Sequence, residues 1–174
     1  MKKIFLLRHA KSDWEDMTQD DFSRPLNARG RQASSDMGRY FLAQGIEPDM
    51  VLCSSAARTR ETEARLKQAC NGGWDCQFLD DLYLAPSHSM LQTLRGVPDD
   101  FASVLLIGHN PGIHDLAMQL VKDGEKVDMA NLARKYPTCT LSAIKVPVSS
   151  FADLTIRKGR LNRFVRPKDL DAMM

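Results

Sequence analysis

The most constraining feature of the sequence is a short apolar run that stops abruptly at an arginine and a histidine. The run Ile4 to Leu7 is followed at once by Arg8 and His9. An apolar run of this length, bounded by a polar turn, predicts a buried strand. In α/β proteins, ligands bind in the crevice at the carboxyl ends of such strands. We therefore expect Arg8 and His9 to line a functional crevice.

Two later segments repeat this arrangement. The run Ser103 to Ile107 predicts a second buried strand, and Gly108-His109 follows it. The run Met50 to Cys53 predicts a third, which is followed by Ser54-Ser55 and, one helical turn later, by Arg58. In a parallel sheet these ends lie on one edge, so two histidines and two arginines should share one pocket.

This set of side chains suits a dianionic phosphoryl group. An arginine remains charged at all ordinary pH values and binds the oxygens of such a group in bidentate fashion. The starts of the helices expected after Ser55 and Asn110 would add backbone N–H donors. The sequence therefore predicts a phosphoryl-binding pocket. His88 and His114 are expected on the surface or on helices. They are not expected to form a metal site with His109, because no carboxylate or cysteine stands at metal-ligand spacing around it.

Strands and helices alternate along most of the chain, which predicts an α/β sandwich with a mostly parallel sheet. A helix should run from an Asn27 cap to Gln44 and end at Gly45, although Gly30 is unusual so near its start. Further helices are predicted at 56–70, at 87–94 with Ser87 as cap, and at 111–120 with Asn110 as cap and Pro111 as first residue. Further strands are predicted at 76–79, 140–146 and 151–156.

Length and composition indicate a single globular domain over residues 1–174. Charged residues make up 26% of the chain and the net charge is only +2, so nothing requires a nucleic-acid partner. No apolar run is long enough to cross a membrane, and the short one after Met1-Lys2-Lys3 is interrupted by Arg8. The four cysteines show no metal-type spacing. We expect a cytoplasmic protein with reduced thiols, no membrane contact and a monomeric state.

The motifs taken together resemble those of the histidine phosphatase superfamily, and specifically its small phosphohistidine phosphatase (SixA-like) branch. The resemblance covers the first two thirds of the chain, in order and spacing. The matching segments are Leu7-Arg8-His9-Ala10-Lys11-Ser12, Arg24-Pro25-Leu26 with Gly30, Ser54-Ser55-Ala56-Ala57-Arg58 with Thr62, and Gly108-His109-Asn110-Pro111-Gly112. The resemblance implies a phosphoglycerate mutase-like, three-layer α/β sandwich without a large cap domain.

The resemblance also implies a role for each matching residue. His9 would attack phosphorus and form a covalent phosphohistidine intermediate. Arg8, Arg58 and His109 would bind the phosphoryl oxygens and stabilise the transition state, and Arg24 would join them. The chemistry needs no metal and no cofactor, because neutral imidazole is a competent nucleophile and arginines can hold the developing charge.

The chain departs from the wider superfamily in two ways. Ala10 follows the first histidine where the superfamily usually has glycine, as in the Ala-Lys-Ser version of this branch. The superfamily also uses a carboxylic acid to protonate an alcohol leaving group, for which Asp80, Asp81 and Glu61 are the candidates here. The leaving group of a phosphoramidate can be protonated beforehand, so it needs a dedicated acid less. The expected substrate is therefore protein phosphohistidine.

Three alternatives to this function remain open, and a fourth is excluded. The same pocket could serve a general phosphomonoesterase or mutase acting on a small phosphorylated metabolite, or a relative that binds without catalysis. A cysteine phosphatase is excluded, because four residues separate Cys53 from Arg58 where that loop needs five. A phosphate- or nucleic-acid-binding module could use the basic C-terminal stretch, in which Phe164 is the one aromatic residue for base stacking. That stretch contains Arg157, Lys158, Arg160, Arg163, Arg166 and Lys168.

Overall fold

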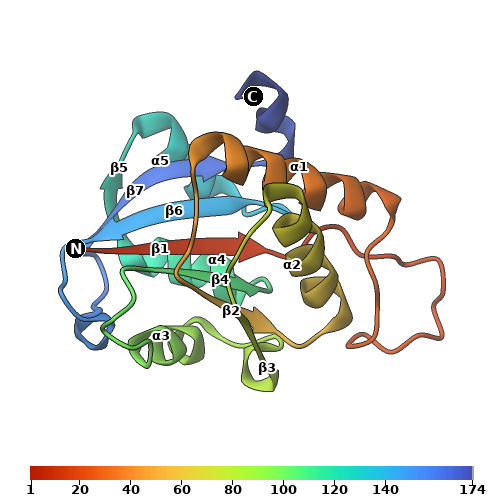
Figure 1. The fold of residues 1–174 in the computed structure, drawn as a ribbon, viewed down its shortest axis with the longest axis horizontal. Coiled ribbons are helices and arrows are strands. Elements are labelled where there is room, and N and C mark those ends of the chain that lie inside the picture. The colour runs from red at the N-terminus through yellow and green to blue at the C-terminus, as the bar shows by residue number, and fades with distance from the viewer. Residues whose placement is uncertain (174) are drawn as a thin grey trace.

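A seven-stranded sheet forms the centre of the molecule, and helices cover both of its faces (Figure 1). The computed structural model describes residues 1–173. The strands are β1 (Lys2–Arg8), β2 (Met50–Ser54), β3 (Cys76–Leu79), β4 (Ser103–Gly108), β5 (Val121–Gly124), β6 (Leu141–Val146) and β7 (Gly159–Val165). The α-helices are α1 (Ala28–Gln44), α2 (Ala57–Cys70), α3 (Ser87–Arg95), α4 (Gly112–Leu120) and α5 (Lys126–Arg134).

The sheet is mostly parallel, as the sequence predicts. Its strand order is β3-β2-β4-β1-β6-β7-β5. Strand β1 pairs in parallel with β4, which in turn pairs in parallel with β2, so the first four strands in this order share one direction. Strand β6 pairs antiparallel with both β1 and β7. The carboxyl ends of β1, β2 and β4 therefore meet at one edge of the sheet.

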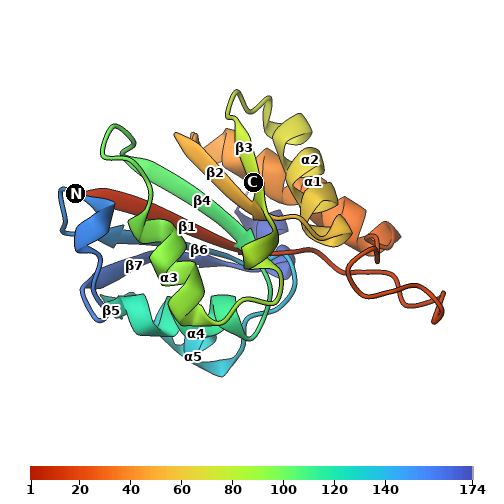
Figure 2. The same cartoon turned by 90° about the horizontal axis from the view of Figure 1, so that it is seen from below.

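The molecule has three layers because the buried strands present apolar side chains on both faces. In β1, Ile4 and Leu6 pack with α3 and α4, whereas Phe5 and Leu7 pack with α1 and α2. Figure 2 shows the sheet from below, with α1 and α2 on one side and α3, α4 and α5 on the other. Alternating side chains on opposite faces follow from the period of two in a strand.

Helix α1 begins and ends where the sequence predicts. The side chain of Asn27 accepts a hydrogen bond from the Gly30 amide at 2.8 Å, and Gly45 closes the helix with φ of 60°. A Cβ atom on Gly30 would lie 2.1 Å from the carbonyl oxygen of Lys11. That carbonyl also accepts a hydrogen bond from the Asn27 amide at 3.0 Å. Gly30 therefore allows the helix start to pack directly against the segment that follows His9.

The C-terminal third differs from the prediction in four elements. Residues 151–156 are not a strand, because Phe151 and Leu154 are buried three residues apart on a short 3₁₀ turn that begins at Phe151. The last strand is β7, where a register shift pairs Ala143 with Arg163 and Ile144 with Leu161. That irregularity breaks the alternation by which a strand is recognised in a sequence. Strand β5 and helix α5 are short and were not predicted at all.

The segment after β7 packs against the rest of the molecule. A 3₁₀ helix at Pro167–Ala172 follows β7, and Leu170 is buried in the apolar cluster that α1 shares. Within residues 1–173, no helix has the length and apolar character needed to cross a membrane.

Candidate active site

His9 lies directly after β1 and is 7% exposed. Its ring nitrogen Nδ1 is 2.7 Å from the carbonyl oxygen of Ala10, so in the neutral ring Nδ1 carries the hydrogen and donates it. The other nitrogen, Nε2, keeps its lone pair and accepts a long hydrogen bond of 3.4 Å from Nε of Arg58. The backbone therefore fixes one tautomer and directs Nε2 toward the arginine.

The segment after His9 is held by a threonine on α2. The Ala10 amide donates to Oγ1 of Thr62 at 3.0 Å, and that hydroxyl donates to the Arg58 carbonyl at 2.7 Å. Ala10 itself is fully buried. These contacts tie the segment that carries His9, directly after β1, to Arg58 on α2.

Arg58 is buried and is oriented by a residue that the sequence analysis missed, Asp21. The guanidinium donates to the backbone carbonyl of Asp21 at 2.6 Å and to its carboxylate at 3.0 Å. The same carboxylate accepts a hydrogen bond from the Tyr83 hydroxyl. Asp21 comes from the polar loop between β1 and α1, and no apolar periodicity in that loop could have identified it.

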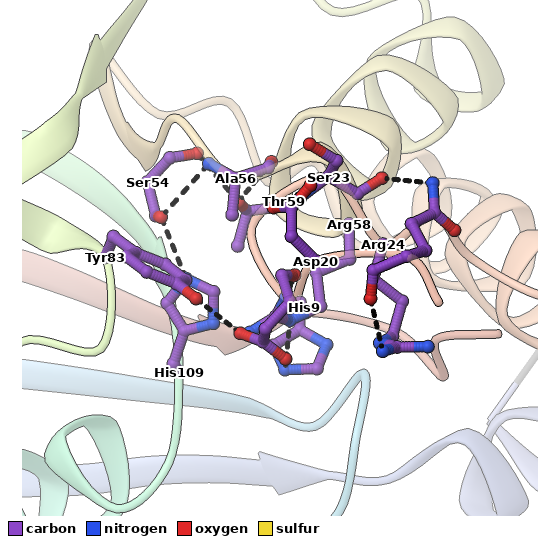
Figure 3. A network of polar contacts seen from close by, with 12 residues as sticks. His9, Asp20, Ser23, Arg24, Ser54, Ala56, Arg58, Thr59, Tyr83 and His109 are labelled. Atoms are coloured by element: carbon purple, nitrogen blue, oxygen red, sulfur yellow. Dashed lines mark hydrogen bonds and ion pairs between the residues drawn. The ribbon is translucent and has the colours of Figure 1, made fainter. Parts of the chain in front are cut away.

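His109 lies directly after β4 and faces His9, with 5.2 Å between the two ring centroids. Its Nε2 is 2.8 Å from Oγ of Ser54 at the end of β2 (Figure 3). Its ring and that of Tyr83 are nearly perpendicular and form a T-shaped contact, with a centroid separation of 5.5 Å. Its Nδ1 is buried and has no hydrogen-bond partner within residues 1–173. Ser54 therefore positions this histidine.

Arg8 completes the set from the last position of β1. One of its terminal nitrogens donates to the carbonyl oxygen of Tyr136 at 2.9 Å. The side-chain amide of Asn110 donates to the same carbonyl at 3.0 Å. The sequence predicted Asn110 as the cap of helix α4, and this prediction is wrong because its side chain binds the Tyr136 carbonyl instead. The Asn110–Pro111 peptide bond is cis and the helix begins at Gly112 without a side-chain cap.

Both histidines are neutral at ordinary pH. Burial is the main cause that lowers the pKa of His9 to about 3, and the charges of Arg58 and Arg8 lower it further. Burial likewise lowers the pKa of His109 to about 3, with His9 and Arg58 as secondary causes. Desolvation disfavours the charged form of an imidazole, so the site holds two uncharged rings beside two guanidinium groups.

The four predicted residues Arg8, His9, Arg58 and His109 line one cavity of about 300 Å³. Its other lining residues are Lys11, Ser12, Trp14, Asp21, Leu84, Asn110 and Thr138. Within residues 1–173, no group of three or more His, Cys, Asp or Glu side chains is arranged to hold a metal ion. The cavity thus combines two neutral imidazoles with two arginines.

The structure does not bring Arg24 into this cavity. Its guanidinium is buried and donates to the backbone carbonyls of Asp13, Asp16 and Gln19 at 3.0–3.3 Å. It also stacks over the ring of Trp14, 4.0 Å from the ring centroid. The expectation that Arg24 binds phosphate is therefore not met by this geometry. Arg24 instead holds together the loop that carries Asp21.

The three acid candidates lie outside the cavity as well. The carboxylate of Glu61 forms ion pairs with Arg31 and Arg65. Asp80 accepts a hydrogen bond from the Ser55 hydroxyl, and Asp81 is exposed. Among the lining residues Asp21 is the one carboxylate, and the hydrogen bond from Tyr83, followed by the Arg58 charge, lowers its pKa. Asp21 is therefore ionised at neutral pH.

The model of the histidine phosphatase superfamily (branch 1) matches residues 4–83 of this chain, which include His9, Arg58 and Tyr83. A Mycobacterium tuberculosis relative, the uncharacterized protein Rv1276c, is 31% identical over 144 residues, which cover 80% of this chain and 87% of the relative. The chain belongs to the histidine phosphatase superfamily. An uncharacterized chloroplastic protein of Arabidopsis thaliana is 27% identical over 76% of this chain, which spans 65% of that longer protein.

Solved structures place this histidine phosphatase in the SixA-like branch. The structure of SixA from Agrobacterium tumefaciens is 29% identical, covers 95% of this chain and 98% of its own, and superposes with a TM-score of 0.81. A protein histidine phosphatase SixA complexed with tungstate superposes with a TM-score of 0.75 at 21% identity, over 97% of this chain and 99% of its own. The phosphoglycerate mutase-like fold without a large cap domain, expected from the sequence, is thereby confirmed.

Proposed function

We propose that this protein is a phosphatase that removes the phosphoryl group from phosphohistidine on another protein, with His9 as nucleophile. Membership of the histidine phosphatase superfamily supports phosphatase activity. The observation that carries the assignment of His9 is its fixed tautomer. Nδ1 is committed to the Ala10 carbonyl, and burial keeps Nε2 unprotonated at physiological pH.

The reaction takes place in two displacements at phosphorus. The lone pair on Nε2 of His9 forms a bond to phosphorus while the P–N bond of the substrate breaks. The electron pair of that bond returns to the leaving imidazole, which has already taken a proton on its other ring nitrogen. A water molecule then attacks the phosphoryl group on His9, releasing inorganic phosphate and a proton to solvent and restoring the free imidazole. Splitting one difficult displacement in this way is the gain from covalent catalysis.

The two arginines and the second histidine act on the phosphoryl oxygens. Arg8 and Arg58 supply fixed positive charge on either side of His9 where negative charge develops in the transition state. When the Ser54 hydroxyl donates to Nε2 of His109, the neutral ring carries its hydrogen on the unpartnered Nδ1. That Nδ1–H is then available to a phosphoryl oxygen. The two guanidinium groups and this N–H would stabilise the negative charge on the phosphoryl oxygens, as a metal ion does in other phosphatases.

The choice of phosphohistidine over a phosphate ester rests on the lack of a protonated acid in the cavity. Asp21, the one carboxylate that lines it, is ionised and already engaged by Arg58 and Tyr83. An alkoxide leaving group needs a proton in the transition state, whereas a protonated imidazole does not. The cavity also lacks a covering domain within residues 1–173, which leaves room for a histidine carried by a protein. We propose further that residues 1–174 act as a single histidine phosphatase domain, because one sheet takes strands from both ends of the chain.

The test compares a phosphohistidine peptide with an aryl phosphate, each without added metal, for wild type and His9→Ala. We expect the wild type to cleave the peptide efficiently and the ester poorly, and His9→Ala to cleave neither while remaining folded by circular dichroism. Efficient cleavage of both substrates would contradict a preference for phosphohistidine over a phosphate ester. That result would favour the alternative, a phosphomonoesterase of small metabolites in which Asp21 is the proton donor.

A further inference from the structure

A second cavity of about 250 Å³ lies beside the catalytic one and is strongly basic. It is formed by the segment after β1, the first turn of α1, the segment after α5 and the C-terminal 3₁₀ helix, which Figure 1 shows beside α1. Five of its lining residues are cationic, and no acidic residue is among them. These cations are Lys11, Arg29, Lys135, Arg166 and Lys168.

Most of this positive charge is uncompensated. Arg166 is neutralised by Asp169, whose two carboxylate oxygens lie 2.7 and 2.9 Å from its guanidinium nitrogens. The other four cations are exposed, and none takes part in a salt bridge among residues 1–173. Positive side chains on a protein surface are usually spread apart, whereas here four of them, from separate segments of the chain, surround one cavity. Such a concavity raises the local concentration of anionic groups.

The basic cavity adjoins the catalytic cavity. Lys11 and Thr138 line both of them, so a ligand can extend from one into the other without leaving the surface. A ligand that fills both is larger than a phosphoryl group with a short carbon chain. The remaining lining of the basic cavity is apolar and includes Ala33, Pro137 and Pro167. This combination of charge and apolar surface suits a folded polypeptide better than a second phosphate.

We infer that the basic cavity binds carboxylate side chains that flank the phosphohistidine on the protein substrate. This inference rests on the proposed function and narrows the substrate class to phosphohistidine in an acidic sequence or on an acidic surface. The cavity gives a role to Arg166 and Lys168 of the basic C-terminal stretch, which the catalytic mechanism leaves unused. Arg29, Lys135, Arg166 and Lys168 do not line the catalytic cavity. They should therefore act on substrate binding rather than on the chemical step.

The experiment uses two phosphohistidine peptides that differ only in their flanks, four glutamates in one and four glutamines in the other. The pocket variant is Lys135→Glu/Lys168→Glu. The matched control is Lys122→Glu/Lys158→Glu, which makes the same charge change at exposed lysines that do not line either cavity. Aryl phosphate hydrolysis serves as the measure of intact catalytic machinery. Each kinetic constant is measured at low and at high salt.

We expect the pocket variant to raise KM for the glutamate peptide about tenfold, as the loss of two screened ion pairs predicts, with kcat nearly unchanged. The glutamine peptide and the aryl phosphate should be cleaved equally by wild type, pocket variant and control. High salt should reduce the preference of the wild type for the glutamate peptide.

Equal cleavage of the two peptides by the wild type would overturn the inference and leave the proposed function standing. An equal rise in KM for the glutamate peptide in the control variant would also overturn it, because a general charge effect would then suffice. If the wild type cleaves the aryl phosphate but neither peptide, the proposed function fails, and the inference fails with it.

Discussion

At the scale of single residues, the site depends on arginines held in fixed positions beside a neutral histidine. The positions of Arg8, His9, Arg58 and His109 in one cavity could be predicted, because each follows or closely follows a strongly apolar strand whose end is easy to recognise. The catalytic roles of these residues stay predictions. Asp21 could not be found in the same way, because its partners Arg58 and Tyr83 are remote in sequence.

The same limit explains why the partners of Arg24 could not be predicted. Its place in the matching segment Arg24-Pro25-Leu26 implied a role in the cavity, yet three backbone carbonyls of its own loop hold the guanidinium. Which carbonyls a loop presents depends on its backbone conformation, and residue types alone do not fix that conformation.

We predict that Arg58→Ala lowers the rate of phosphoryl transfer by roughly 10²–10³-fold, because a preorganised cation is removed from the transition state. It should also weaken the binding of vanadate, a mimic of the pentacoordinate phosphorus, measured by inhibition. Arg65→Ala is the matched control, since Arg65 lies on the same helix and pairs with Glu61 at the surface. Unchanged vanadate affinity in Arg58→Ala would remove this arginine from the phosphoryl site.

At the scale of elements, the strand ends and the turns behind them position the site. Helix α1 could be delimited to the residue, because Asn27 and Gly45 are strong cap signals at either end of a clear helical period. Strands β5 and β7 could not, because β5 has only four residues and β7 is interrupted by a register shift. A short or irregular strand can be recognised only through the neighbouring strands with which it pairs, and a single sequence does not identify those strands.

One close approach between elements can be tested directly. A Cβ atom on Gly112, at the start of α4, would lie 1.9 Å from the carbonyl oxygen of Ala85. We predict that Gly112→Ala lowers the free energy of unfolding by about 1–3 kcal/mol, the usual cost of overpacking. It should also lower kcat, since the turn that carries His109 must shift. Urea titration and steady-state kinetics check both effects.

The control for that substitution is Gly73→Ala, since a Cβ atom at Gly73 would meet nothing within 4 Å. Its unfolding free energy should stay within about 0.5 kcal/mol of the wild type, as for most surface changes. If the two alanine variants are equally stable, the contact between the β4–α4 turn and the Ala85 loop does not constrain the site.

At the scale of the whole molecule, the fold keeps two histidines uncharged at a cost that depends on pH. Burial lowers the pKa of His9 and of His109 from the ordinary value of 6.5 to about 3. Between these two pH values the unfolded chain binds more protons than the folded protein. The contribution of these residues to stability is therefore flat above about pH 6.5 and becomes steadily less favourable as the pH falls toward 3.

We predict that the unfolding free energy of His9→Ala falls less steeply than that of the wild type between pH 6.5 and pH 4. Chemical denaturation at several pH values measures this difference. His88→Ala serves as the control, because His88 is exposed on α3, and it should keep the wild-type slope. Parallel curves for all three proteins would mean that His9 has no lowered pKa in the folded state.

The central claim is that Nε2 of His9 carries the phosphoryl group during turnover, and trapping the intermediate tests it most directly. The enzyme is mixed with phosphohistidine peptide, quenched in alkali within milliseconds, and analysed by peptide mass spectrometry and ³¹P NMR. We predict an acid-labile, alkali-stable phosphoryl group on His9, bonded to Nε2 because Nδ1 is held by the Ala10 carbonyl. A phosphoryl group on His109 or on Nδ1 of His9, or turnover without any phosphorylated enzyme, would contradict this account.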